Sequence, residues 1–269
     1  MPEKIIETTL EGLHVYESGS AANPAILFLH GSPLSGRMWE PQLEGLTEFH
    51  CLAPDLPEHG RSAGIAPFDM KDTVRRLVEL IEGSTPNGRA HVVGLSFGGV
   101  VAQAMLVQAP EVVDHVILSG TAARPGKVFM AILTLYINLN KPILAVIPSD
   151  WLSALFTWQF GIPKKYGSAF SEDIRAVKGE ALARFILSTY SEIVTPLQPR
   201  SPVLVAVGGK ETMAAKIMAR RLHRTISGSR GILVPGAAHV RSLQKPEAFN
   251  ALIRAWVNDR SLPEEMLHL

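Results

Sequence analysis

Short apolar runs alternate with longer helical patterns along most of this chain of 269 residues. The apolar runs are Ala25–His30, His50–Ala53, Ala90–Gly94, Val113–Leu118, Pro202–Val207 and Gly231–Val234. The helical patterns are Asp69–Glu82, Phe97–Gln108, a stretch that begins near Glu211, and Pro246–Asp259. Alternation of this kind predicts an α/β protein whose mostly parallel central sheet has helices on both faces. Ile5–Glu17, with Glu11-Gly12 at its turn, predicts an opening hairpin.

The alternation stops after Ser119-Gly120 and resumes near Pro202. Residues 121–199 are rich in aromatic residues, Leu and Ile, and they lack the alternation of a strand. Because this block falls between two strands of one sheet, we expect it to be a helical cap or lid rather than an independent domain. The predicted organisation is therefore a core of residues 1–120 and 200–269 with a cap insertion at 121–199.

The charge and cysteine content excludes several classes of partner. With 26 Lys and Arg against 25 Asp and Glu, the chain has no electrostatic footprint for nucleic acid and no basic run that suggests a membrane. The single Cys51 cannot form an intramolecular disulfide, and no metal site is expected. We expect no signal peptide, because the start has no apolar run. The apolar stretch Val128–Leu139 is too short to span a bilayer. We expect a cytoplasmic monomer or homodimer that binds a small molecule.

The sharpest motif is Gly94-Leu95-Ser96-Phe97-Gly98, which joins a predicted strand directly to a predicted helix. In this setting a serine sits on a tight turn with its hydroxyl above the sheet. The flanking glycines allow the backbone and the neighbouring helix to approach closely. We interpret Ser96 as a catalytic nucleophile; the alternative is a glycine-rich turn with an incidental serine.

A serine nucleophile requires a base, and the base requires an orienting carboxylate. His239 lies in a loop after the last predicted strand, and Glu211 follows the strand Pro202–Val207. Both therefore fall at the carboxyl edge of the sheet, where catalytic groups of open α/β sheets gather. The alternatives are that His239 is a solvated loop residue and that Glu211 only favours the start of a helix. Weaker candidates for the acid are Asp150, Asp173 and Glu192.

Acyl transfer also requires hydrogen-bond donors for a developing oxyanion. One donor should be the backbone N–H of Phe97, the residue after the nucleophile. The second should be the N–H of Ser32, in the loop His30-Gly31-Ser32-Pro33 after the first buried strand. Pro33 has no N–H and cannot serve. The alternative is that this loop is a simple turn.

Four segments together resemble the α/β-hydrolase family: His30–Pro33, the turn Gly94–Gly98, Pro54–Ser62 and Pro235–His239. The resemblance covers nearly the whole chain apart from the block 121–199. It implies the α/β-hydrolase fold, Ser96 and His239 as nucleophile and base, Ser32 and Phe97 as the oxyanion hole, and no cofactor.

Two positions depart from the family pattern. Glu211 stands where the family usually has Asp, so the acid carries one additional methylene. Glu58 replaces the first glycine of the usual Asp-Leu-Pro-Gly-His-Gly loop, and it either shifts the backbone or faces the entrance of the site. We interpret this loop as structural.

The expected activity is hydrolysis of carboxylic esters with short to medium acyl chains, or of lactones such as acyl-homoserine lactones, through an acyl-enzyme. The alternatives are a cofactor-free lyase or perhydrolase of the same fold, and a small-molecule receptor with weak hydrolysis. A serine at the turn argues against dehalogenase and epoxide hydrolase members, which place Asp there. Apolar residues of the cap block either line a substrate pocket or pack onto the core. They are Phe129, Leu133, Tyr136, Trp151, Leu155, Phe156, Trp158 and Phe160.

Overall fold

Nine strands form one sheet in the computed structural model, which describes residues 5–176, 187, 189–195 and 198–269. The strand order is β1-β2-β4-β3-β5-β6-β7-β8-β9. All pairs from β4 to β8 are parallel, whereas β1–β2, β2–β4 and β8–β9 are antiparallel. The strands are β1 (Ile6–Leu10), β2 (Leu13–Ser18), β3 (Ala25–Leu29), β4 (His50–Pro54), β5 (Ala90–Leu95), β6 (Val113–Ser119), β7 (Val203–Gly208), β8 (Arg230–Val234) and β9 (Leu267–His268).

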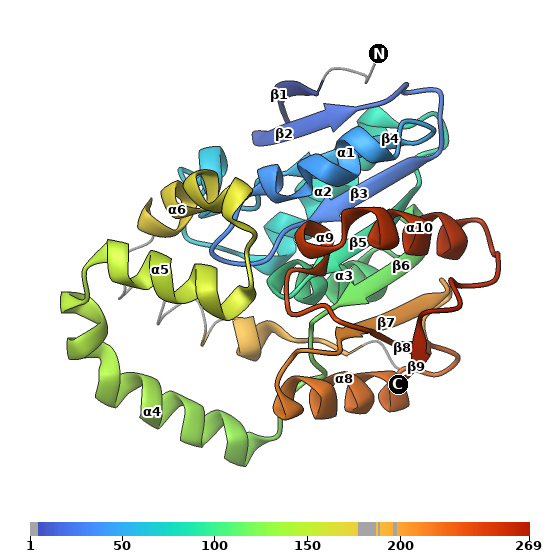
Figure 1. Cartoon of the computed structure of the whole chain (residues 1–269). Helices are drawn as coiled ribbons and strands as arrows, with labels where there is room; N and C mark the ends of the chain where they lie inside the picture. Colours follow the sequence, from blue (N-terminus) through green and yellow to red (C-terminus); the bar gives the residue numbers. More distant parts are fainter. Residues whose placement is uncertain (1–4, 177–186, 188, 196–197) are drawn as a thin grey trace.

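Helices cover both faces of this sheet (Figure 1). One hydrophobic cluster packs the sheet against α2 (Met70–Ser84), α3 (Phe97–Gln108) and α8 (Met213–Thr225). A second cluster packs the other face against α1 (Glu40–Gly45), α9 (Arg241–Gln244) and α10 (Pro246–Val257). Short 3-10 turns connect these elements at η1 (Gly36–Trp39), η2 (Gly60–Ser62) and η3 (Pro110–Val112). The predicted mostly parallel sheet with helices on both faces is confirmed.

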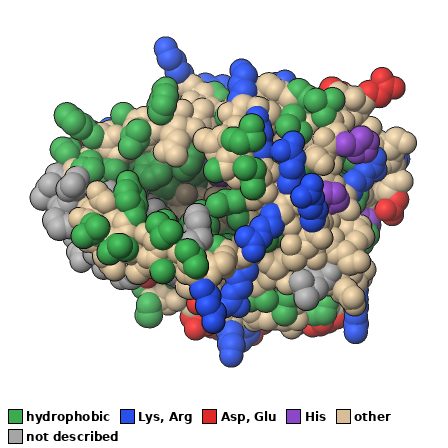
Figure 2. All heavy atoms as spheres, turned by 90° about the horizontal axis from the view of Figure 1, so that it is seen from below, with side chains coloured by type: hydrophobic (Ala, Val, Ile, Leu, Met, Phe, Trp, Pro, Cys, Tyr) green, Lys and Arg blue, Asp and Glu red, His purple; other side chains and the backbone are tan. Residues whose placement is uncertain are grey.

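Between β6 and β7 most of the described residues are helical, and they form α4 (Lys127–Val146), α5 (Ser149–Phe160), η4 (Lys164–Tyr166) and α6 (Gly167–Ala176). We call α4, α5 and α6 the inserted helices. α6 buries Phe170 and Ile174 in the second cluster, and the Ser35 hydroxyl donates a 2.7 Å hydrogen bond to Asp173. Figure 2 shows that the molecule is hollowed beside these helices. None of the helices in the described part of the chain is long and apolar enough to cross a membrane.

Most predicted elements differ from the observed ones by one or two residues, and the differences have local causes. α2 begins at Met70 because the Asp69 side chain accepts the Asp72 N–H as an N-cap. α10 ends at Val257, before Asp259, which has a left-handed φ of 53°. The opening hairpin turns at Glu11 and Gly12, as predicted, and the structure gives both residues a positive φ.

Candidate active site

Ser96 lies on a sharp turn between β5 and α3. Its backbone has φ 53° and ψ −111°, a conformation that non-glycine residues rarely adopt. Neighbouring glycines make the turn possible: a Cβ on Gly94 would lie 2.4 Å from the Gly98 carbonyl oxygen. A Cβ on Gly98 would lie 2.1 Å from the Leu29 carbonyl oxygen. The two glycines therefore let the start of α3 pack directly on β3 and β5.

Glu211 and His239 meet at the same edge of the sheet, although they are 28 residues apart. The Glu211 Oε2 atom lies 2.8 Å from His239 Nδ1. A carboxylate at this position accepts the proton of Nδ1 and leaves Nε2 as the acceptor nitrogen of a neutral imidazole. Gly120 packs against the ring, because a Cβ there would lie 3.0 Å from His239 Cε1. The tautomer and the orientation of His239 are thus fixed by its neighbours.

Arg241 holds the other side of the Glu211 carboxylate. Its side chain is fully buried and donates hydrogen bonds to Glu211 Oε1 and to the Ser119 hydroxyl. The Gly208 N–H also donates to Glu211 Oε1, at 2.9 Å. Both carboxylate oxygens therefore have partners, as a buried charge requires. Nothing in the sequence reasoning pointed to Arg241.

These contacts determine the charge state of Glu211. Burial by itself raises the pKa of Glu211, but the hydrogen bond from His239 and the positive charge of Arg241 outweigh burial and lower that pKa to about 2. Glu211 is therefore ionised throughout the pH range in which imidazole titrates. The predicted alternative role, at the start of a helix, belongs instead to Thr212, whose hydroxyl accepts the Ala215 N–H as the N-cap of α8.

Two buried histidines support the loop that carries Ser32. His30 Nε2 accepts the Leu56 N–H at 2.9 Å. His59 donates from Nδ1 to the Pro57 carbonyl at 2.9 Å, so its Nε2 accepts the Ser32 hydroxyl at 3.0 Å. Burial lowers the pKa of His59 to about 4, which keeps that ring neutral. The loop is therefore fixed by hydrogen bonds that both histidines accept.

Glu58, the departure from the family loop, adopts φ 64°. This is the left-handed region that a glycine favours, so the backbone keeps the turn and carries the strain of a side chain there. Glu58 does not line the cavity of the site in the described structure.

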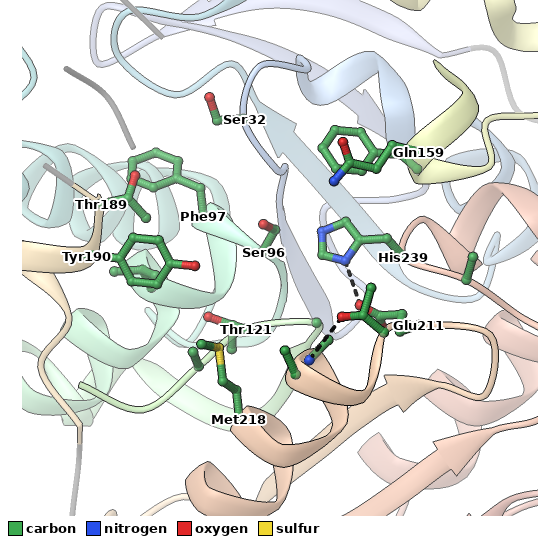
Figure 3. Close-up of a pocket in the computed structure, with 18 of the residues that line it drawn as sticks. Ser32, Ser96, Phe97, Thr121, Gln159, Thr189, Tyr190, Glu211, Met218 and His239 are labelled. Carbon is green, nitrogen blue, oxygen red and sulfur yellow. Dashed lines mark hydrogen bonds and ion pairs between the residues drawn. The ribbon is translucent and has the colours of Figure 1, made fainter. Parts of the chain in front are cut away.

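A cavity of about 490 Å³ joins these residues, and Ser32, Ser96, Phe97, Glu211 and His239 all line it. Figure 3 shows Ser96 and His239 on adjacent walls, with the imidazole between Ser96 and Glu211. No dashed line joins Ser96 to His239, so the hydroxyl and the imidazole do not hydrogen-bond in this structure. The cavity brings together the residues predicted as nucleophile, base and oxyanion donors with Glu211, the favoured candidate for the acid.

Of the eight predicted pocket residues, the structure places Phe156 and Phe160 on the cavity wall. The centres of the Phe160 and His239 rings lie 5.2 Å apart. Leu133 does not line this cavity, and the side chain of Phe129 lies outside the described residues. The remaining four are exposed on the surface of the inserted helices: Tyr136, Trp151, Leu155 and Trp158.

The three weaker candidates for the acid lie elsewhere. Asp150 pairs with Arg175 at the surface, and Asp173 accepts the hydrogen bond from Ser35. Glu192 is exposed. None of these carboxylates contacts His239 in the described part of the chain, so Glu211 is the acidic residue beside the imidazole.

Sequence reasoning missed several polar residues of the cavity wall. Thr121, Gln159 and Tyr190 all line the cavity (Figure 3). The Thr121 hydroxyl is buried and has no hydrogen-bond partner among the described residues. One signal was available, because Thr121 follows the end of β6 at the same sheet edge as Ser96. No cluster of three or more His, Cys, Asp or Glu in the described residues could hold a metal ion.

Comparisons with known proteins agree with this fold. A profile of the "Alpha/beta hydrolase family" matches residues 26–252. An "AB hydrolase superfamily protein" of Gibberella zeae is 28% identical over 96% of this chain and 87% of its own. A "pimeloyl-[acyl-carrier protein] methyl ester esterase" of Neisseria meningitidis is 29% identical over 76% of this chain and 67% of its own. Among solved structures, a thermophilic esterase from Thermogutta terrifontis matches with TM-score 0.77 and 23% identity, over 95% of this chain and 98% of its own.

Proposed function

The chain belongs to the alpha/beta hydrolase family, and on that premise we propose that it is a serine hydrolase that cleaves carboxylic esters of short to medium acyl chains. The observation that carries the proposal is the Glu211–His239 contact beside Ser96 on its strained turn. An oriented neutral imidazole next to a serine on such a turn is the arrangement that nucleophilic acyl transfer requires. The Neisseria relative, which is named for ester hydrolysis, supports the same reaction class.

In the proposed mechanism, Ser96 Oγ attacks the carbonyl carbon of the ester while His239 Nε2 takes the hydroxyl proton. The tetrahedral oxyanion accepts hydrogen bonds from the N–H groups of Phe97 and Ser32. When the intermediate collapses, the alkoxide leaves with the proton from His239 and the acyl group stays on Ser96. Water then attacks the acyl-enzyme by the same route and releases the carboxylic acid.

Each supporting residue has a physical task in this scheme. Glu211 is ionised and bonded to Nδ1, so it stabilises the imidazolium that forms when His239 accepts a proton. Phe97 opens α3, where the N–H groups of the first turn point out of the helix and the helix dipole favours negative charge. Ser32 is held by His59.

The cavity supports a small and largely apolar substrate. Its volume of about 490 Å³ lies within the range of small-molecule sites. Phe156, Phe160, Ile193 and Met218 supply apolar wall, and Tyr190 supplies a hydroxyl. We further propose that residues 121–199, which contribute Phe156 and Phe160, form the cap of this cavity.

The test is a panel of p-nitrophenyl esters, thioesters and lactones of graded chain length, assayed with wild type and with Ser96→Ala. We expect ester turnover by wild type and a loss of at least about 10⁴-fold in kcat for Ser96→Ala. Ser227→Ala is the control. Ser227 is exposed in the turn before the amino end of β8, whereas His239 follows the carboxyl end of that strand. An Ser96→Ala enzyme with undiminished turnover would refute the assignment. A wild type that is labelled by a fluorophosphonate without turning over any ester would indicate a receptor.

A further inference from the structure

Positive charge is concentrated in one part of the chain. Residues 121–225 contain 14 Lys and Arg but only six Asp and Glu, although the whole chain contains 26 and 25. This segment therefore has a formal charge of +8 and the remaining residues have −7. The near-zero net charge, from which we predicted no membrane partner, conceals this separation.

α8 is the most basic element of the segment. It contains four Lys and Arg and no carboxylate. Arg220, Arg221 and Arg224 are exposed, and Lys216 is half-buried. None of the ion pairs between described residues involves any of the four. Figure 2 shows Lys and Arg side chains running across this face of the molecule in a band.

Exposed apolar side chains are concentrated beside this band. In the described residues, fourteen large hydrophobic side chains are exposed, and ten of them lie on α4, α5 and α8. Trp158 is 79% exposed and Trp151 is 74% exposed. Such a concentration marks an interaction surface rather than ordinary surface variation. The ten are Val128, Ile132, Leu135, Tyr136, Leu139, Trp151, Leu155, Trp158, Met213 and Ile217.

Two of these helices, α5 and α8, also line the cavity. α5 places Phe156 on the cavity wall and Trp158 in solvent. α8 likewise places Met218 on the wall and its neighbour Ile217 in solvent. In Figure 2, hydrophobic side chains surround the hollow and the basic band runs along one side of it. We call the exposed apolar residues of α4, α5 and α8, together with the basic residues of α8, the entrance face.

We propose that the entrance face binds to the surface of an anionic lipid bilayer. Apolar side chains enter the boundary between headgroups and acyl chains, and basic side chains attract anionic headgroups. Tryptophan is enriched at this boundary, and two of the four Trp residues lie on this face.

Charge distinguishes this partner from a second copy of the chain. A symmetric dimer pairs the same patch on both subunits, and one whose two-fold axis passes beside α8 would bring two α8 helices together. Each α8 carries four positive charges and no negative one, so the pairing would be repulsive. An anionic bilayer satisfies the apolar and the basic residues together.

The proposal does not depend on the chemistry of Ser96. Binding to vesicles therefore has to be the same for wild type and for Ser96→Ala. If the protein hydrolyses esters but does not bind vesicles, only this inference is overturned. If it binds vesicles but has no esterase activity, only the proposed function is overturned.

The direct test is flotation with two kinds of vesicle. One consists of phosphatidylcholine alone, and in the other roughly one third of the lipid is phosphatidylglycerol. We expect binding to the anionic vesicles and release by added salt. Tryptophan fluorescence gives a second readout, because Trp151 and Trp158 leave water when the face binds, whereas Trp39 is already buried. The emission maximum should shift to the blue only with anionic vesicles.

Two sets of variants separate the basic and apolar contributions. The basic variant is R220Q/R221Q/R224Q, and its control removes three exposed basic residues outside the segment, K71Q/R75Q/R260Q. Each basic residue at an anionic surface contributes about fivefold, so the basic variant should lose roughly a hundredfold in partitioning and the control little. The apolar variant is W151S/W158S, which should lose both binding and the fluorescence shift. Its control is V107S/L267S, two exposed apolar residues elsewhere.

Circular dichroism confirms that each variant is folded before its binding is compared. Equal binding of the basic variant and its control would overturn the proposal, as would equal binding to neutral and anionic vesicles. Absence of binding of the wild-type protein to both kinds of vesicle would also overturn it. If sedimentation then shows a dimer that W151S/W158S abolishes, the entrance face binds a second copy instead.

Discussion

Replacing Arg241 by Met tests the buried ion pair behind the candidate active site. Arg241 is fully buried, and its guanidinium bonds to Glu211 and to Ser119. Methionine has a similar length and no charge, so it fills much of the same space. The variant leaves Glu211 with the His239 ring and the Gly208 N–H as its remaining partners.

The expected loss of stability follows from charge and burial. Opposite charges about 4 Å apart attract by ~4 kcal/mol at an effective dielectric constant near 20. Removing one partner of such a pair costs about 3–5 kcal/mol, because the other charge stays buried. All the partners of Glu211, first the hydrogen bond from His239 and then the charge of Arg241, together hold its pKa at about 2 against an ordinary 4.5, which corresponds to ~3 kcal/mol of stability. That contribution is fully present above pH 4.5 and is lost as the pH falls toward 2.

The assay is a double-mutant cycle by urea denaturation at pH 7, using wild type, Arg241→Met, Glu211→Gln and the double variant. We expect Arg241→Met alone to lose about 3 kcal/mol, and the double variant to be more stable than additivity predicts by at least ~2 kcal/mol. The matched cycle on the exposed pair Asp150–Arg175 should give a coupling below ~1 kcal/mol. Equal coupling energies in the two cycles would refute this reasoning, because the buried pair would then stabilise the protein no more than an exposed pair does.

Two further predictions concern the fold around the site. Gly98→Ala should destabilise the protein by more than ~2 kcal/mol in urea denaturation, because its Cβ would lie 2.1 Å from a backbone oxygen. Gly83→Ala, in open space on α2, should be neutral or stabilising by up to ~1 kcal/mol, and equal losses would contradict the packing argument. Burial raises the pKa of Asp173 to about 6, so its ionisation destabilises the folded state as the pH rises from about 4 to above 6. Asp173→Asn should therefore raise Tm at pH 7.5 but not at pH 4, and an equal change at both values would exclude this cause.

The sheet and the edge where the site lies could be predicted because they depend on local patterns. β3, β5 and β7 are short apolar runs, and parallel strands bring their carboxyl ends to one edge. Ser96 directly follows the end of β5, and Glu211 comes three residues after the end of β7, so their approximate positions required no knowledge of side-chain packing. Glu58 shows the limit of this reasoning, since the sequence could not decide whether the backbone or the side chain adjusts. The backbone adopts a positive φ.

The pocket residues were less predictable because hydrophobicity does not reveal which face of a helix is covered. α5 is apolar on several sides, so Phe156 and Trp158 looked equivalent in the sequence. Two residues correspond to about 200° of rotation around a helix. Phe156 therefore turns toward the cavity while Trp158 turns toward solvent. The polar residue Thr121 was missed because a single threonine after a strand carries no distinctive pattern.

Glu211 shows why a substitution at a family position has to be considered together with its neighbours. One carboxylate oxygen bonds to His239, and the other bonds to Arg241 and to the Gly208 N–H. Arg241 itself comes two residues after His239, so the loop that supplies the imidazole also supplies the countercharge for the acid. Aspartate is one methylene shorter and would withdraw the carboxylate from both side chains unless the loop moved with it. Glu211 and the buried Arg241 therefore form one structural unit. A sequence motif around His239 would include Arg241 but not Glu211, which lies 28 residues earlier, so it would not reveal the pair.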